Sequence, residues 1–364
     1  MNQGRVALLH LAFHEYTASL ARELDALVDL TVIHPTSASD EMARMLPTTA
    51  ARKTFNKPRF RDPSNLKMAR TLIHMLRGFD LVHVQQAGDP WVDLALSAGL
   101  AQKTIVTVHD VSPHSGDGDR IPGSFVARRR LHRRAAGLIV HTSDMATQLE
   151  ADSPAPIGVI PHPSTRRSFV GNDEPPVLAP GNRKDVLFFG RIWPYKGLDL
   201  LIAAMRLVVD RVDGARLVIA GRGANVEELV PDVPWIALHN RFIPNSEVAS
   251  FFESSAVVAL PYRDATQSGV GVMAIDFRRP VVASPVGGLP SLFADPHGGR
   301  SGASFVDPTD AAAMADAIVR LLTDDDEYAL AQSALSAVAE TIDPRVVAEE
   351  TADFYAGCLA RLDD

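Results

Sequence analysis

The chain has 364 residues, of which 46% are hydrophobic and 22% charged, and its formal net charge is −8. This length accommodates two domains with separate cores, and the single cysteine, Cys358, excludes an intramolecular disulfide framework and a zinc site built from several cysteines. The sequence has no run of 18 apolar residues and its first residues resemble no signal peptide, so we expect a cytoplasmic protein without a membrane-spanning helix.

The first half of the chain alternates short apolar runs with segments of helical periodicity. Apolar runs of this length are typical of buried strands, and their alternation with helices is typical of parallel sheets covered on both faces. We expect strands at 6–9, 30–33, 81–85, 104–109, 138–141 and 158–160, and helices at 19–27, 93–99 and 144–150.

Charge is distributed unevenly between the two halves. Residues 1–167 carry 20 Lys and Arg against 16 Asp and Glu, whereas residues 168–364 carry 16 against 28. The basic residues concentrate in Arg52–Arg70 and in Arg128–Arg134, and such runs attract anionic surfaces or substrates. A solvated helix face explains the second run equally well. Aromatic residues are too sparse among these cations to favour nucleic-acid binding.

The strand and helix pattern resumes after a segment rich in proline and glycine. Residues 161–185 contain Pro163, Pro175, Pro176 and Pro180 with little apolar periodicity, which is typical of a linker. Beyond it we expect strands at 186–189, 217–220, 235–239, 256–260, 281–283 and 303–306, and helices at 198–209, 245–253 and 310–322. The final segment, 344–362, has a helical pattern of its own.

The doubled pattern predicts an α/β protein of two doubly wound, Rossmann-like domains. We expect a first domain over 1–165, a linker over 166–184, a second domain over 185–343, and a C-terminal helix over 344–364 that packs back on the first domain. Sheets of this kind bind ligands at the carboxyl ends of their strands, so two of them predict one active site in a shared cleft.

The most informative segment lies at the start of the second domain. An apolar strand over 186–189 ends at Gly190, two cations follow at Arg191 and Lys196, and a helix begins near Leu198. Arginine binds phosphate oxygens bidentately and lysine acts as a point charge. A strand end that carries both before a helix start is therefore suited to a diphosphate. An ordinary strand–helix loop with two solvated cations is the alternative.

This segment resembles the phosphate-binding loop of retaining glycosyltransferases of the GT-B fold, specifically the large family 4. Three further segments follow in the order and spacing of that family: 218–223, 241–244 and 280–290. Three strand ends of the first half are also similar to the family: 107–110, 140–143 and 159–163. The resemblance covers most of the chain and is strong from about residue 187 to residue 322.

The resemblance implies a retaining glycosyltransferase that moves a hexosyl group from a nucleoside diphosphate sugar to a hydroxyl of a glycan, lipid-linked or small-molecule acceptor. Arg191 and Lys196 would stabilise the departing diphosphate, without a cofactor. We expect no metal, since no Asp-x-Asp cluster for Mg²⁺ and no Cys/His ligand spacing stands out. The donor-binding residues implied are Gly190, Arg191, Lys196, Gly221, Arg241, Phe242, Ile243, Thr266, Gln267, Ser268, Gly269 and Val270.

The chain departs from the family at the segment that binds the donor sugar. Family 4 enzymes usually carry two glutamates eight positions apart before the Pro-Val-Val strand, and the residues found here are Ala265 and Met273. Polar residues at 266–268 precede an apolar helix instead, with Ser268 as a candidate N-cap and Gly269 allowing a ligand to approach the first N–H groups. This stretch resembles a variant branch of the family that lacks the glutamate pair. A plain capped helix is the alternative.

Candidate acceptor residues lie at strand ends of the first domain. In the family, a histidine at the place of His109 lies over the donor sugar, where its imidazole could bind a sugar hydroxyl or its carbonyl could accept from the acceptor. The resemblance thus implies a catalytic role for His109, and a buried structural histidine is the alternative. The segment 10–17 lacks the glycines that the family often has there. The acceptor-binding residues that we expect are His14, Glu15, His83, Gln85, Gln86, His109 and Asp110.

We expect a front-face displacement through an oxocarbenium-like transition state, in which the leaving phosphate helps to deprotonate the acceptor. Two other functions are compatible with the same scaffold: a nucleotide-sugar 2-epimerase, and a non-catalytic member that binds a nucleotide sugar. The expected partners are the nucleotide sugar, the acceptor, and an anionic surface at the inner face of the membrane contacted through Arg128–Arg134, and we expect no nucleic acid.

Overall fold

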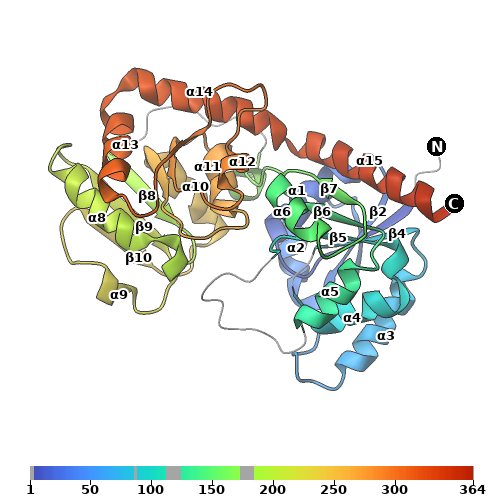
Figure 1. Ribbon diagram of the computed structural model, residues 1–364. Coiled ribbons are helices and arrows are strands. Elements are labelled where there is room, and N and C mark those ends of the chain that lie inside the picture. The colour runs from blue at the N-terminus through green and yellow to red at the C-terminus, as the bar shows by residue number, and fades with distance from the viewer. Residues whose placement is uncertain (1–3, 86–87, 112–123, 173–183, 364) are drawn as a thin grey trace. The chain divides into compact units, whose positions relative to one another are not determined.

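The computed structural model describes residues 4–85, 88–111, 124–172 and 184–363, which form two compact units (Figure 1). The first unit comprises the described residues of Met1–Val111, Asp117–Pro163 and Ile342–Asp364, and the second those of Ser164–Thr341. Gln86 and most of the expected linker, residues 173–183, lie outside the described residues. Among the residues described, no helix is long and apolar enough to cross a membrane.

The first unit is built on a parallel sheet in the order β3-β2-β1-β4-β5-β6-β7. The order reverses between β1 and β4, and open α/β sheets bind ligands at the carboxyl ends of strands beside such a reversal. The strands are β1 (Arg5–Leu9), β2 (Asp29–Pro35), β3 (Ala51–Phe55), β4 (Leu81–Gln85), β5 (Thr104–Thr107), β6 (Gly137–Val140) and β7 (Ile157–Val159).

Helices cover both faces of this sheet because its central strands are apolar on both sides. On β1, Ala7 and Leu9 pack into one core and Val6 and Leu8 into another. The first core contains residues of α3 (Asn65–Leu76), α4 (Pro90–Gly99), α5 (Ser124–His132) and α6 (Ser143–Glu150). The second contains residues of α1 (His14–Leu24), α2 (Ser39–Met45) and α15 (Pro344–Asp363). Short 3-10 helices η1 (Thr36–Ala38) and η2 (Ala101–Lys103) lie in connections.

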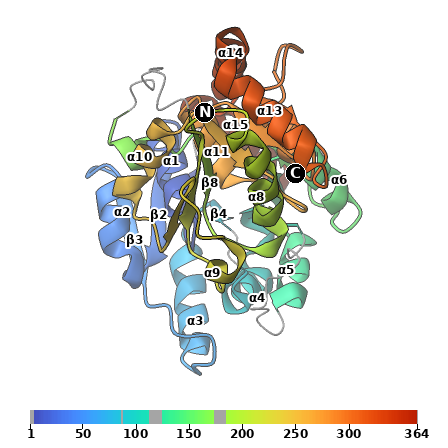
Figure 2. The same ribbon diagram turned by 90° about the vertical axis from the view of Figure 1, so that its left-hand side faces the viewer.

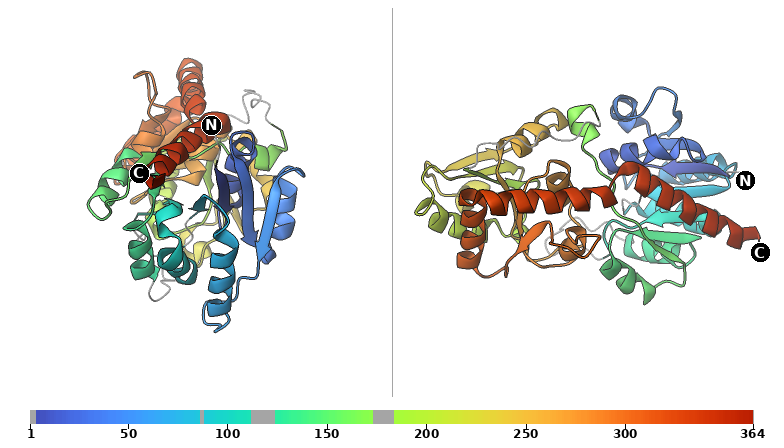
Figure 3. Two further views of the ribbon diagram at one scale, coloured as in Figure 1. Left: turned by 90° about the vertical axis from the view of Figure 1, so that its right-hand side faces the viewer. Right: turned by 90° about the horizontal axis from the view of Figure 1, so that it is seen from above.

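The C-terminal helix α15 belongs to the first unit and lies along it in Figure 3. Its side chains Val347, Ala348 and Tyr355 are at most 1% exposed. A Cβ atom at Gly137, in strand β6, would lie 2.8 Å from the ring of Phe354. This strand therefore needs glycine at the point where the helix packs on it.

The second unit contains a parallel sheet in the order β10-β9-β8-β11-β12-β13. Figure 2 shows α8 and α10 on opposite sides of β8. The strands are β8 (Asp185–Phe189), β9 (Arg216–Gly221), β10 (Ile236–Asn240), β11 (Val257–Leu260), β12 (Val281–Ala283) and β13 (Ala303–Phe305). The helices are α7 (Arg167–Val170), η3 (Pro194–Lys196), α8 (Leu198–Val209), α9 (Val226–Leu229), α10 (Asn245–Ser254), α11 (Gly269–Asp276), α12 (Leu289–Leu292), α13 (Ala311–Thr323) and α14 (Asp325–Thr341).

The predicted fold class is confirmed, and each strand expected from the sequence is present with its ends shifted by at most two residues. Strand β3 was not predicted because it lies at the sheet edge and four of its five residues, Ala51 to Thr54, are exposed. The N-terminal part of the first unit extends to Pro163, and Thr165 belongs to the second unit, where the Asp276 carboxylate accepts hydrogen bonds from its backbone and hydroxyl at 3.0 and 3.4 Å.

Candidate active site

Three glycines shape the carboxyl ends of the strands in the second unit. Gly190 follows β8 and has a φ of 94°. A Cβ atom at Gly221 would lie 1.9 Å from the carbonyl oxygen of Gly190. A Cβ atom at Gly197 would lie 1.9 Å from the carbonyl oxygen of Pro261. A side chain at Gly221 or Gly197 would force the backbone apart, so the loop from 190 to 197 depends on glycine for its close packing.

Lys196 is 9% exposed, and its ammonium group lies at this loop. Its Nζ donates to the hydroxyl of Tyr262 at 3.3 Å, and a Cβ atom on Gly190 would lie 3.4 Å from it. Among the described residues, no carboxylate forms an ion pair with Lys196. A buried cation without a carboxylate partner is unfavourable unless an anion binds there. Arg191 is exposed, and no hydrogen bond or ion pair joins its guanidinium to another described residue.

The N-terminus of α11 lies against the same loop. The Ser268 hydroxyl caps the helix by accepting from the backbone N–H of Gly271 at 3.0 Å. A Cβ atom on Gly269 would meet no atom within 4 Å, so there is open space beside this first residue of α11. Val270 lies close to Gly190: a Cβ atom built on Gly190 would be 3.2 Å from Val270 Cγ2. The positive end of α11 thus adjoins Lys196, as an anion site requires.

The loop after β10 adjoins the end of β9. The backbone N–H of Arg241 donates to the carbonyl of Gly221 at 3.1 Å, whereas its guanidinium is paired with Glu247. Phe242 is 73% exposed and Ile243 is buried. The predicted donor residues therefore gather around one group of strand ends, but the charge of Arg241 is already paired within the loop. Thr266 and Gln267 are half-buried beside Ser268.

In the first unit, three of the predicted acceptor residues form one buried hydrogen-bonded group. His83 and Gln85 are inaccessible and His109 is 1% exposed. The side-chain Nε2 of Gln85 lies 3.3 Å from His83 Nε2, and the side-chain Oε1 of Gln85 lies 2.9 Å from His109 Nε2. The other ring nitrogen of His109 lies 3.3 Å from His141 Nε2. Both ring nitrogens of His109 are therefore engaged within the protein.

Burial keeps the histidines of this group uncharged. Desolvation is the main cause in each case, and neighbouring imidazoles add to it for His83, His109 and His162. The pKa is lowered to about 3 in His83 and His162, to about 4 in His141, and well below 6.5 in His109. Asp110, the next residue along the chain, is exposed.

Sequence reasoning missed the residues that cover His109. Phe13 adopts a left-handed conformation (φ 64°) at the N-cap of α1, and its ring stacks on that of His109 at a centroid distance of 3.9 Å. His14 follows, with Nδ1 2.8 Å from His10 Nε2 and Nε2 3.3 Å from a carboxylate oxygen of Glu41. Glu15 is half-buried. The only signal for this arrangement in the sequence is the absence of glycine after β1.

Two sequence profiles match the chain. The profile described as Glycosyltransferase Family 4 matches residues 14–163, and the one described as Glycosyl transferases group 1 matches residues 183–324. The chain belongs to glycosyltransferase family 4. Among its relatives are D-inositol 3-phosphate glycosyltransferases of Mycobacterium tuberculosis and Mycobacterium bovis, 31% identical over 237 residues, which are 60% of this chain and 48% of theirs. The chain thus spans about half the length of these curated relatives.

Solved structures share its fold along almost the whole chain. A glycosyltransferase from Rickettsia africae superposes with a TM-score of 0.73 at 16% identity, covering 99% of each chain. Anabaena HepE in complex with UDP-glucose superposes with a TM-score of 0.70 at 14% identity, covering 97% of this chain and 100% of that one. At such identities the likeness shows the fold, which is GT-B.

Family 4 membership makes residues 265–273, the segment predicted to bind the donor sugar, unusual. Ala265, at the place of the first usual glutamate, is 6% exposed and has no polar side-chain atom. A Cβ atom at Gly287 would lie 1.5 Å from the carbonyl oxygen of Ala265. The segment is therefore held by backbone packing, and Thr266, Gln267 and Ser268 supply its polar side chains. No three His, Cys, Asp or Glu side chains cluster as metal ligands in the described part of this family 4 chain.

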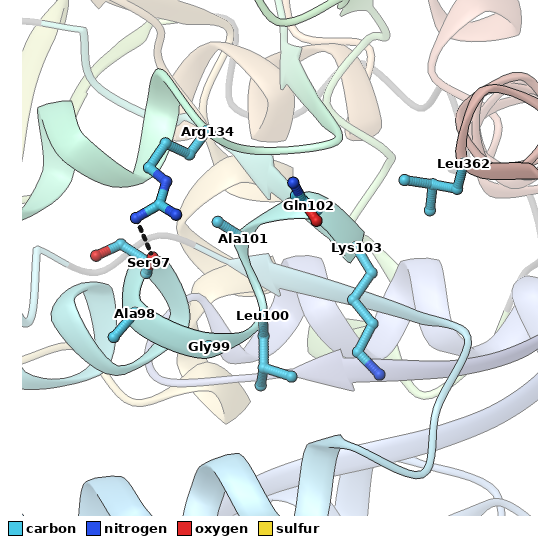
Figure 4. Close-up of a pocket in the computed structure, with 9 residues that line it drawn as sticks. All are labelled: Ser97, Ala98, Gly99, Leu100, Ala101, Gln102, Lys103, Arg134 and Leu362. Carbon is cyan, nitrogen blue, oxygen red and sulfur yellow. Dashed lines mark hydrogen bonds between the residues drawn. The ribbon is translucent and has the colours of Figure 1, made fainter. Parts of the chain in front are cut away.

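A surface pocket of about 390 Å³ lies at the opposite end of strand β5 (Figure 4). Its two cations are bound to main-chain carbonyls: Arg134 donates to Ser97, and Lys103 donates to Arg77 and Phe79. The pocket faces the amino end of β5, whereas the candidate residues of this family 4 protein follow the carboxyl ends of their strands. It is therefore not part of the candidate active site.

Proposed function

We propose that this protein is a retaining, metal-independent glycosyltransferase that moves a hexosyl group from a nucleoside diphosphate sugar to an acceptor hydroxyl. The observation that carries the proposal is the anion site of the second unit. There the buried Lys196, without a carboxylate partner, adjoins the exposed Arg191 and the open N-terminus of α11. A diphosphate supplies the charge that this site lacks.

In the proposed reaction the bond between the anomeric carbon and the diphosphate oxygen breaks, and the diphosphate leaves with the electron pair. The acceptor oxygen forms its bond to the same face of the sugar, and its proton passes to an oxygen of the leaving phosphate. Arg191, Lys196 and the N–H groups of α11 stabilise the negative charge as it develops, a role that a metal ion performs in other enzymes. The products are the glycoside and the nucleoside diphosphate.

The relatives support this donor class. The mycobacterial proteins are named as glycosyltransferases, and HepE is described in complex with UDP, with UDP and glucose, and with UDP-glucose. Among acceptors, we propose a hydroxyl compound that binds at the carboxyl ends of β1, β4 and β5 in the first unit. The nearby side chains are Phe13, His14 and Asp110, with Gln85 and His109 beneath them.

We also propose that α5 contacts an anionic membrane surface, where a lipid-linked acceptor is found. Arg129, Arg130 and Arg133 are exposed, and Phe125 and Val126 on the same helix are 57% and 70% exposed. Exposed arginines beside exposed apolar side chains match a surface with anionic headgroups over an apolar interior.

Incubation with a panel of nucleotide sugars tests the proposed activity. Release of nucleoside diphosphate that depends on an acceptor, with the anomeric configuration retained by NMR, is the expected result. Interconversion of one nucleotide sugar into its 2-epimer would instead show an isomerase. Binding without any conversion, seen as a thermal shift with UDP, GDP, ADP or dTDP conjugates, would show a non-catalytic protein.

A further inference from the structure

A series of hydrogen-bonded, buried polar side chains extends through the first unit from α15 to strand β5. The Tyr355 hydroxyl lies 2.6 Å from His83 Nδ1, and His83 Nε2 lies 2.6 Å from the hydroxyl of Thr107. Gln85 lies between His83 and His109, at 3.3 and 2.9 Å. None of these five side chains is more than 1% exposed. Their hydrogen bonds must therefore be satisfied among themselves and their protein neighbours.

At the other end of this hydrogen-bonded group, the contact of His141 with Ile160 determines which ring nitrogen of His141 carries the proton. His141 Nδ1 lies 2.9 Å from the carbonyl oxygen of Ile160, which can only accept, so His141 carries a proton on Nδ1. A neutral His141 then has a lone pair on Nε2, which lies 3.3 Å from Nδ1 of His109. His109 must donate from Nδ1 for these two rings to be hydrogen-bonded.

The side-chain amide of Gln85 can be turned by about 180°, which exchanges its oxygen and its NH₂ group without changing its shape. The two orientations require different numbers of protons on the pair His109 and His141. If the Gln85 carbonyl faces His109, as it is placed in the structure, that ring carries its proton on Nε2, and two lone pairs meet between His109 and His141 unless an extra proton is added. If its NH₂ group faces His109, it donates to Nε2, and Nδ1 of His109 donates to His141. His83 then carries its proton on Nε2 and accepts from Tyr355. The second arrangement satisfies every group without a charge.

The surroundings favour the uncharged arrangement. The titratable groups around His109 are Tyr16 on α1, His83 on β4, His141 after β6 and His162 after β7. Asp110 is exposed next to His109 along the chain. Burial lowers the pKa of His141 to about 4 and that of His109 well below 6.5. An added proton on this pair would therefore be expelled at neutral pH.

We propose that Gln85 is a positioning residue for glycosyl transfer, whose amide holds His109 in its uncharged form with the proton on Nδ1. This inference rests on the proposed function. Positive charge develops on the sugar in an oxocarbenium-like transition state, and the proposed acceptor, which attacks that sugar, binds at the strand ends where His109 lies. An imidazolium there would repel that charge, whereas a neutral ring does not. A glutamine can donate to His109, which a carboxylate cannot do.

The variant Gln85→Glu tests the proposal. A carboxylate accepts from Nε2 of His109, so two lone pairs again meet between His109 and His141, and the pair binds an extra proton. We expect kcat of the wild type to be flat between about pH 6 and about pH 8.5. The kcat of the variant should be at least tenfold lower near pH 6. It should recover as the pH rises and the His109–His141 pair loses its one extra proton. The matched control is Gln102→Glu, the same change at an exposed position of the first unit.

Nitrogen-15 NMR of histidine-labelled wild-type protein measures the tautomers without reference to activity. We expect Nδ1–H in His109 and His141 and Nε2–H in His83. A proton on Nε2 of His109, or an imidazolium at neutral pH, would overturn the proposal. So would a Gln85→Glu enzyme whose pH profile matches that of Gln102→Glu. If the wild type converts no nucleotide sugar while NMR shows the expected tautomers, the proposed function has failed but the tautomer assignment stands.

Discussion

At the scale of single residues, the proposed donor site depends on two cations with different surroundings. Lys196 is almost buried and is held by the hydroxyl and ring of Tyr262, whereas Arg191 is exposed. A buried lysine and an exposed arginine can hold a diphosphate together, since the first is already in place and the second has space to reach the ligand. The two substitutions should therefore both reduce catalysis, with a larger effect on donor KM for Arg191.

We expect Lys196→Ala and Arg191→Ala each to lower kcat/KM by about two to three orders of magnitude. Loss of one charge-assisted contact to a diphosphate removes on the order of 2–4 kcal/mol of transition-state stabilisation. Steady-state kinetics with the donor found in the panel measures the effect. Arg206→Ala, which removes an exposed cation from α8, is the control and should behave as the wild type. Activity within a few-fold of wild type in both site variants would rule out this loop as the phosphate site.

The same two cations predict that transfer does not need a divalent metal. Activity should be unchanged by excess EDTA, because Arg191, Lys196 and the N–H groups of α11 stabilise the leaving group. The measurement is the initial rate before and after chelation. Inactivation that is reversed by added Mg²⁺ or Mn²⁺ would contradict the proposal.

At the scale of elements, the carboxyl ends of strands β1 and β4 to β7 bring several histidines into one desolvated region. The pKa of His10, His83 and His162 is lowered to about 3 and that of His141 to about 4. Each binds its proton more weakly in the folded protein than in the unfolded chain, where the pKa is 6.5. The unfolded state therefore gains protons first as the pH falls.

The first unit should consequently be acid-labile. Below pH 6.5, the free energy of unfolding should fall as the pH drops toward the pKa values that these histidines have in the folded protein. The decrease should be up to about 1.4 kcal/mol per histidine for each pH unit. Calorimetry between about pH 7.5 and about pH 5 measures the decrease in Tm and the protons taken up on unfolding. His162→Asn should reduce that uptake by about one proton, and His74→Asn, the same change at an exposed position, is the control.

The C-terminal helix gives a second prediction at this scale. Gly137→Ala should destabilise the first unit by about 1–3 kcal/mol, because the added methyl group would overlap the ring of Phe354 and the sulfur of Cys358. The double variant Gly137→Ala/Phe354→Leu should recover part of the loss. Chemical denaturation measures the free energy of unfolding.

The control for this prediction is Gly357→Ala on the exposed side of the same helix, where a Cβ atom meets nothing within 4 Å. That change should stabilise α15 by about 0.5–1 kcal/mol, since alanine favours a helix interior. Equal stability of Gly137→Ala and wild type would show that α15 does not pack on β6 as described.

At the scale of the whole molecule, the charge asymmetry of the sequence becomes a local surface feature of α5. We expect the protein to sediment with anionic vesicles at low salt and not with neutral ones, since each exposed cation near anionic lipid contributes about 1 kcal/mol. Replacement of Arg129, Arg130 and Arg133 by glutamine should abolish the binding. Replacement of Arg206, Arg320 and Arg361, exposed elsewhere, removes the same charge and should not. Absence of binding at low salt would indicate an acceptor in solution.

The sequence by itself determined the two sheets and the strand–loop–helix arrangement of residues 185–209. Buried parallel strands are continuous apolar runs, and a strand–Gly–Arg–Lys–helix segment places its cations at a strand end whatever surrounds it, so local pattern was sufficient for both. It did not reveal strand β3 or the helices α2, α3 and α14. Strand β3 is an exposed edge strand and α2 has only seven residues, so neither has a clear apolar period.

Only the tertiary structure decided what the histidines do. His83 lies within β4, whereas His109 follows β5 and His141 follows β6. Their side chains come together because these parallel strands are neighbours in the sheet and bring their carboxyl ends to one edge. The partners that fix them, Tyr355 and Phe13, come from the last helix and from a left-handed turn after the first strand. Sequence spacing carries no information on such contacts, because each depends on packing between segments up to 272 residues apart.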